Sequence, residues 1–149
     1  MGDLKMRVLI AGLLIGLSLS SSAADGTGSL QITFTNIKSG KGELVVTLYR
    51  NGEHWLDGVQ AYRRQLVKIG RNTATVTFAG LAFADYGLYA FHDENSNRKF
   101  DMRWLPWPRP AEGAAVSNNA FRNGPPRYEA AKFRFDRDGM RLNLALKYY

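Results

Sequence analysis

The sequence predicts an all-β protein, an antiparallel β-sandwich of about seven strands with one long ordered loop. Apolar and polar residues alternate in short stretches separated by turn residues, as in strands that bury one face. After residue 25, no segment sustains the 3.6-residue periodicity of a helix, apart from a short helical turn expected near residues 128–131. Short alternating strands divided by turns are typical of an immunoglobulin-like sandwich.

Residues 1–24 are expected to be a secretory signal peptide. Lys5 and Arg7 give a basic start, residues 8–19 are largely apolar, and small residues follow. The apolar run is shorter than the roughly 20 residues that a membrane span needs. An uncleaved anchor is the alternative. The folded domain is therefore expected over residues 25–149, in the periplasm or secreted.

Alternation places six strands, and a turn at residues 39–42 predicts that the first two form a hairpin across residues 30–50. Residues 60–68 fit either a seventh strand or an irregular crossing. The six expected strands are residues 29–35, 44–50, 73–78, 86–91, 132–135 and 141–148.

A long loop is expected over residues 93–127, which are rich in Pro, Asn and Gly. Loops of this length in compact domains are usually functional or disordered. Its large apolar residues are not typical of disorder, so we expect it to be ordered and packed across one end of the sandwich. These residues are Phe100, Trp104, Trp107, Val116 and Phe121.

Composition excludes several classes of function. The chain has no cysteine, so disulfides, cysteine metal sites and thiol catalysis are excluded. It carries 20 Lys and Arg against 13 Asp and Glu, a formal net charge of +7. Export disfavours nucleic acid as the partner of these scattered charges. An anionic envelope component, such as lipid headgroups or an acidic polysaccharide, is one expectation, and a merely solvated basic surface is the other.

Three stretches, "YGLYAFHDENSNRKFD", "SNNAFRNGPPRYEAAKFRF" and "LNLALKYY", resemble the bacterial exported family named domain of unknown function 2141. The resemblance implies a small exported β-sandwich, similar to the transthyretin-like or prealbumin-like group. It implies no activity. The chain departs from the family pattern at Ser96 and Arg98, where members usually have Gly, and at Ala115 and Val116, where they usually have Gly-Phe.

The stretch "HDENSNRKFD" places oxygen-bearing side chains on alternate residues, at Asp93, Asn95, Asn97 and Asp101. A calcium loop uses such positions and takes a backbone carbonyl at the seventh, which is Lys99. The expected ligands of calcium, or of another hard cation, are therefore these five residues.

Three features weaken the match to a calcium loop. Arg98 stands where the loop favours Gly, and Trp104 where a bidentate Glu is usual. Arg98 and Lys99 also offset two of the negative charges, and Glu112 is one residue that would supply the missing carboxylate. The alternative is a polar turn, because Asp and Asn side chains bond their own backbone two residues on.

Two aromatic segments form a candidate ligand site. Trp104 and Trp107 alternate with prolines, which favour extended chain. Their rings either contact a ligand, such as a sugar or a partner, or cover the end of the sandwich. His54 and Trp55 lie in the other irregular stretch, and all four residues line one pocket if the two loops lie at the same end.

An enzyme is the least supported hypothesis. A small hydrolase would use His92 with Asp93 or Asp101 as acid and base. No nucleophile motif accompanies them, and a histidine that bonds a loop carbonyl explains His92 equally. The sequence favours an exported, non-catalytic binding or structural module. The hydrolase and a cation-dependent adhesion or assembly domain are the alternatives.

Overall fold

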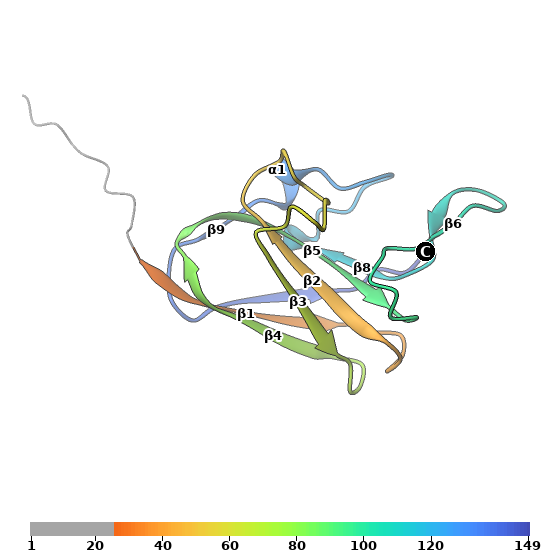
Figure 1. Ribbon diagram of the computed structural model, residues 1–149, viewed down its shortest axis with the longest axis horizontal. Coiled ribbons are helices and arrows are strands. Elements are labelled where there is room, and N and C mark those ends of the chain that lie inside the picture. Colours follow the sequence, from red (N-terminus) through yellow and green to blue (C-terminus); the bar gives the residue numbers. More distant parts are fainter. Residues whose placement is uncertain (1–25) are drawn as a thin grey trace, which may run out of the picture.

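Two β-sheets pack face to face in the computed structural model (Figure 1), which describes residues 26–149. The expected signal peptide, residues 1–24, lies outside the described residues. One sheet has the order β10-β1-β4, with β1 and β4 antiparallel and β1 and β10 parallel. Its strands are β1 (Thr27–Thr35), β4 (Ala74–Ala82) and β10 (Met140–Ala145).

The second sheet has the order β3-β2-β5-β8, and β9 pairs with the start of β5. All of its pairs are antiparallel. The strands are β2 (Glu43–Tyr49), β3 (Arg63–Lys68), β5 (Ala84–Asp93), β8 (Ala114–Val116) and β9 (Phe133–Phe135). The prediction of an all-β sandwich is confirmed.

The main core lies between the two sheets, and alternation along each strand builds it. Every second residue of β1 is buried, and the same period runs through most of β4, because successive side chains of a strand point to opposite faces. β5 is buried on both faces, and its alternate residues Tyr86, Leu88 and Ala90 belong to this core. The largest fully buried side chains of this core are Tyr86, Phe34, Phe78, Phe135, Leu30 and Ile32.

The predicted hairpin across residues 30–50 is wrong. β1 and β2 lie in different sheets, and β2 pairs with β3 and β5 instead. The connection between β1 and β2 crosses from one sheet to the other, with Ile37 buried on the way. Within residues 60–68, which fit either a strand or a crossing, residues 63–68 form the regular strand β3 beside β2.

The outer face of the second sheet is covered as well, which is why β2 is buried along almost its whole length. A small apolar cluster lies there, formed by Val45, Phe91 and Ala114 with Tyr89 and Phe100 against them. Two short helices, η1 (Ser117–Asn119) and α1 (Tyr128–Ala131), follow β8. The expected helical turn near residues 128–131 is thus present.

The long loop is ordered, but it does not close one end of the sandwich. It folds back over the outer face, where the Phe100 ring packs on Phe91 with 5.6 Å between ring centroids. It also contains a two-stranded hairpin of β6 (Met102–Arg103) and β7 (Arg109–Pro110), which projects from the body (Figure 1). Trp104 and Trp107 lie on the tip of this hairpin and are exposed, so of the two alternatives for these rings, the one in which they cover the end of the sandwich is wrong.

In the part of the chain that the structure describes, no helix has the length and apolar character needed to cross a membrane.

Candidate functional site

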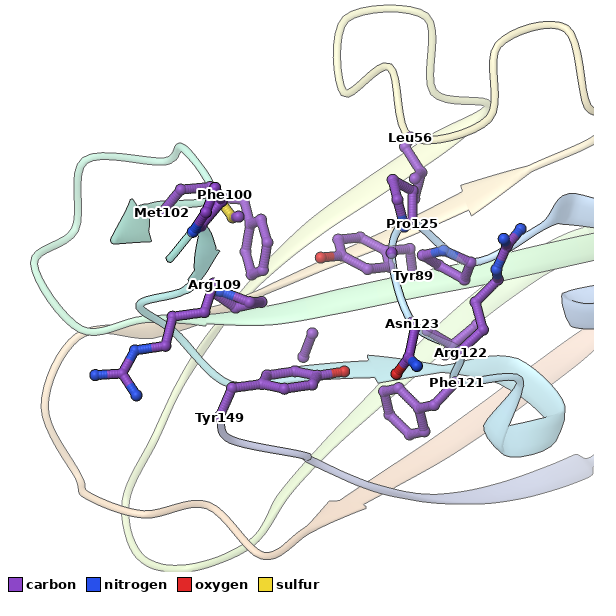
Figure 2. Close-up of a pocket in the computed structure, with 16 residues that line it drawn as sticks. Leu56, Tyr89, Phe100, Met102, Arg109, Phe121, Arg122, Asn123, Pro125 and Tyr149 are labelled. Carbon is purple, nitrogen blue, oxygen red and sulfur yellow. The ribbon is translucent and has the colours of Figure 1, made fainter. Parts of the chain in front are cut away.

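A pocket of about 500 Å³ opens on the outer face of the second sheet (Figure 2). Its floor comes from β5 and β8, and its walls come from the hairpin, the turn at residues 121–126 and the end of the chain. The walls are mainly aromatic, aliphatic and proline side chains. Besides Tyr89, the lining residues include Leu56, Phe100, Met102, Val116, Phe121, Asn123, Pro125 and Tyr149.

Polar groups are few in this pocket, and they are placed around its middle. Figure 2 shows the hydroxyls of Tyr89 and Tyr149 directed into the space. Burial raises the pKa of the Tyr89 hydroxyl well above its usual range, so it keeps its proton and can donate a hydrogen bond at any physiological pH. The Asn123 amide offers a further donor and acceptor.

Two arginines stand at the rim. Figure 2 shows the guanidinium groups of Arg109 and Arg122 directed away from the middle of the pocket. A smaller cavity of about 190 Å³ adjoins on the same face and is bordered by further basic side chains, among them Arg64 and Arg98. The Nη2 of Arg64 donates to the Arg98 carbonyl at 3.2 Å, which ties the long loop to β3. An anionic group at the pocket mouth would therefore meet positive charge.

An aromatic cluster supports the pocket from behind. Trp55 contacts Tyr49 and Tyr128 edge to face, with ring centroids 5.1 and 5.6 Å apart, and its Nε1 donates to the Pro126 carbonyl at 2.8 Å. That bond holds the turn that forms one wall. The Tyr128 hydroxyl donates to the Arg50 carbonyl at 2.8 Å, so the loop after β2 is anchored to the same cluster.

The four residues predicted to share a ligand site do not line this pocket. Trp55 lies in the aromatic cluster, His54 lies beside it, and neither is a lining residue. Trp104 and Trp107 lie on the exposed hairpin tip. β3 is a true strand, so the loop after β2 and the loop after β5 start at opposite ends of the sheet.

The pocket was missed because most of its lining residues come from irregular chain and the rest from several different strands. Phe121 and Phe100 were expected to pack, but nothing in their spacing shows that they face one cavity with Tyr149 at the far end of the sequence. The sequence carries one usable signal, which is Tyr89. It lies on the outer face of a strand whose alternate residues form the core, and an aromatic residue at such a position indicates that the outer face is covered.

The predicted cation ligands do come together, in a turn that satisfies itself. The Asp93 carboxylate is buried and accepts the backbone N–H groups of Asn97 at 3.1 Å and Arg98 at 2.6 Å. The Asn95 side-chain oxygen accepts the Asn97 N–H at 3.0 Å, and the Asn97 oxygen accepts the Lys99 N–H at 2.8 Å. These are the bonds of the polar-turn interpretation.

Asp101 lies at the centre of this turn. One of its carboxylate oxygens accepts from the side-chain amides of Asn95 at 2.7 Å and Asn97 at 2.9 Å. Arg98 adopts a left-handed backbone with φ of 61°, so this position takes the conformation for which Gly was expected. Within residues 26–149, no group of three or more His, Asp or Glu side chains is arranged to hold a metal ion. An ion would thus depend on the amide and carbonyl oxygens.

Glu112 reaches the turn from the far side of the hairpin. The residue is 6 % exposed, and its carboxylate accepts the Asp101 N–H at 3.1 Å. Burial, and to a lesser degree the Asp101 and Asp93 carboxylates, raise the pKa of Glu112 to about 7. Glu112 therefore lies beside Asp101, although within residues 26–149 these carboxylates are not grouped to hold a metal ion.

His92 is fully buried, with both ring nitrogens bonded. Its Nε2 lies 2.8 Å from the Lys41 carbonyl, which can only accept, so Nε2 carries the proton. Nδ1 lies 2.8 Å from the Tyr148 hydroxyl, which donates to it and itself accepts the Lys38 N–H at 3.0 Å. A histidine enclosed in this way does not reach a substrate, so the hydrolase hypothesis loses the base on which it depends.

Comparison with curated proteins and with solved structures finds no match. The likeness to transthyretin-like modules therefore remains a prediction. A family model does match, over residues 32–143, which include both sheets, the pocket floor and the turn at Asp93. The chain thus belongs to the family described as an uncharacterized protein conserved in bacteria, domain of unknown function 2141.

Proposed function

We propose that this protein is an exported, non-catalytic binding module that holds a small amphipathic molecule in the outer-face pocket. The observation that carries the proposal is a mainly apolar pocket of about 500 Å³ with two tyrosine hydroxyls directed into it. Pockets of roughly 300–1,000 Å³ with apolar walls and a few convergent polar groups are typical of small-molecule sites.

The walls indicate what kind of molecule fits. Aromatic and proline side chains favour a flat or chain-like apolar body. The Tyr89 and Tyr149 hydroxyls and the Asn123 amide suit one or two oxygen atoms near its middle. Arg109 and Arg122 at the rim favour a negative charge at its outer end.

Two fluorescent probes test this proposal. N-phenyl-1-naphthylamine is neutral, and 1-anilinonaphthalene-8-sulfonate has a similar body with an anionic group. Both should bind at one saturable site, and the sulfonate should bind more tightly because it meets the rim arginines. Non-saturable binding of both probes would contradict the proposal.

Two variants locate the site. Phe121→Ser and Tyr149→Ser each remove an aromatic wall, and each should weaken probe binding by roughly tenfold, since an apolar contact of that size contributes about 1.5–3 kcal/mol when fully buried. Val59→Ser is the control, because Val59 is 90 % exposed and does not line the pocket. Equal affinities in all three variants would place the probe elsewhere.

A second function is favoured by one observation, the arrival of Glu112 at the turn of Asp93 and Asp101. We propose that calcium binds there and braces the long loop. The ion would displace the amide bonds to Asp101 and take oxygens from Asp93, Asn95, Asn97 and Asp101, with the Lys99 carbonyl and the Glu112 carboxylate as further ligands. Such binding is structural, and a cation-dependent adhesion or assembly role would build on it.

Calorimetric titration with calcium tests the second proposal. The protein should bind one calcium ion, and its melting temperature should rise at millimolar calcium, because an ion that binds only the folded state stabilises it. Asp101→Asn should abolish both effects. Asp136→Asn, at an exposed surface carboxylate, is the control. If the melting temperature does not respond to millimolar calcium, the calcium proposal fails and the polar-turn interpretation remains.

A further inference from the structure

The β6–β7 hairpin ends in a tip, residues 104–108, that presents apolar side chains to solvent. Trp104 is 70 % exposed, Leu105 84 % and Trp107 71 %. The hairpin is a separate two-stranded sheet that projects from the sandwich (Figure 1). Large apolar side chains exposed together usually mark an interaction surface.

Two arginines lie directly behind this tip. Arg103 and Arg109 are register partners across the hairpin, and both are exposed. Like charges opposite each other on paired strands destabilise the pairing. No salt bridge within residues 26–149 joins either arginine to a carboxylate. An anionic surface against the hairpin would relieve this repulsion.

We propose that the hairpin tip docks the protein on a lipid bilayer that contains anionic headgroups. The two indole rings and Leu105 would enter the boundary between headgroups and acyl chains, where Trp is enriched in membrane proteins. Arg103 and Arg109, one residue further from the tip at either side, would then lie at the level of the phosphates. The contact lies on the membrane and does not span it.

The shape and charge of the tip favour a bilayer over a protein. The tip is a convex projection, and the segment 98–109 carries Arg98, Lys99, Arg103 and Arg109 against the single carboxylate of Asp101. A soft anionic surface accepts such a projection without a preformed groove. A second copy of the chain is disfavoured, because a symmetric tip-to-tip contact would bring the same arginines together.

Vesicle flotation tests the proposal. The protein should float with phosphatidylglycerol vesicles, bind phosphatidylcholine vesicles much more weakly, and lose binding as salt is raised. The double variant Arg103→Gln/Arg109→Gln should bind phosphatidylglycerol about 20- to 30-fold more weakly, since each basic residue near such a surface contributes about a fivefold factor. Trp104→Ser/Trp107→Ser should lose at least about tenfold through the lost apolar contact.

Fluorescence gives a second, independent measurement. Brominated acyl chains should quench the wild-type protein, whereas the double Trp variant, which keeps only the clustered Trp55, should not be quenched. Val59→Ser is the matched control for an exposed apolar side chain outside the hairpin and should float like the wild type. Because all the substituted residues are exposed, thermal melting should confirm that every variant folds.

Three outcomes would overturn the proposal. They are a wild-type protein that stays in solution with phosphatidylglycerol, tip variants that float as well as the wild type, and equal binding to both lipids. Sedimentation that shows self-association, lost in the double Trp variant and without vesicle binding, would assign the tip to a second copy instead.

Discussion

Glu112 offers a sharp test of the electrostatics inside the long loop. The substitution Glu112→Gln keeps an oxygen that accepts the Asp101 N–H but removes the negative charge. A pKa raised from 4.5 to about 7 means that the folded state binds the proton more tightly than the unfolded chain. The stability that Glu112 contributes is therefore complete below about pH 4.5, and it is lost as the pH rises through about 7.

The size of this effect follows from the shift. At about 1.4 kcal/mol per pKa unit, the full shift would correspond to about 3.5 kcal/mol. Solvent near the loop screens part of the interaction, so we expect about 1–2 kcal/mol. Glu112→Gln should accordingly be more stable than the wild type by about 1–2 kcal/mol at pH 8, with little difference at pH 4.5.

Urea unfolding at pH 4.5 and pH 8 measures this difference for each protein. Comparing the pH dependence of the variant with that of the wild type cancels the titration of the groups that do not interact with Glu112. Glu129→Gln is the control, because Glu129 is an exposed carboxylate whose one salt bridge within residues 26–149 is with Lys132. A Glu112→Gln protein that is less stable than the wild type at pH 8 would refute the reasoning, and equal pH dependence would refute it too.

Two further predictions concern the packing around the site. Ser117→Ala should cost about 1–3 kcal/mol in urea unfolding, because its buried hydroxyl accepts the Leu88 N–H at 2.9 Å and donates to the Ala131 carbonyl at 2.5 Å. Gly42→Ala should cost at least about 2 kcal/mol, because Gly42 has φ of 68° and a Cβ there would overlap the Asp93 carbonyl oxygen. Gly70→Ala, with open space around it, should leave stability within about 0.5 kcal/mol.

Strand positions could be predicted from the sequence, whereas strand partners could not. Alternation reports which face of a strand is buried, and it placed β1, β4 and β5 to within a few residues. It does not report which neighbour a strand has. The short turn at residues 39–42 therefore suggested a hairpin, although the connection passes between sheets and β1 pairs with β10 from the far end of the chain.

The candidate site was predictable only where one short segment builds it. The turn from Asp93 to Asp101 is local, so the spacing of its residues was enough to predict that their side chains lie together. The pocket combines residues from four separate segments, and no local pattern relates Tyr149 to Phe100. Buried His92 shows a further limit, because its partner Tyr148 is 56 residues away along the chain.

The pocket and the hairpin tip share part of their structure, and this relation has a measurable consequence. Met102, Pro108 and Arg109 line the pocket and also belong to the hairpin that carries the tip. When the tip lies on a bilayer, one wall of the pocket lies close to the lipid, so an amphipathic ligand would reach the pocket along a short path through water.

We expect wild-type protein loaded with N-phenyl-1-naphthylamine to deliver the probe to phosphatidylglycerol vesicles faster than the variant Trp104→Ser/Trp107→Ser does, as measured by stopped-flow fluorescence. The double variant should hold the probe with unchanged affinity, because neither indole lines the pocket. Equal transfer rates would show that the pocket and the tip act independently.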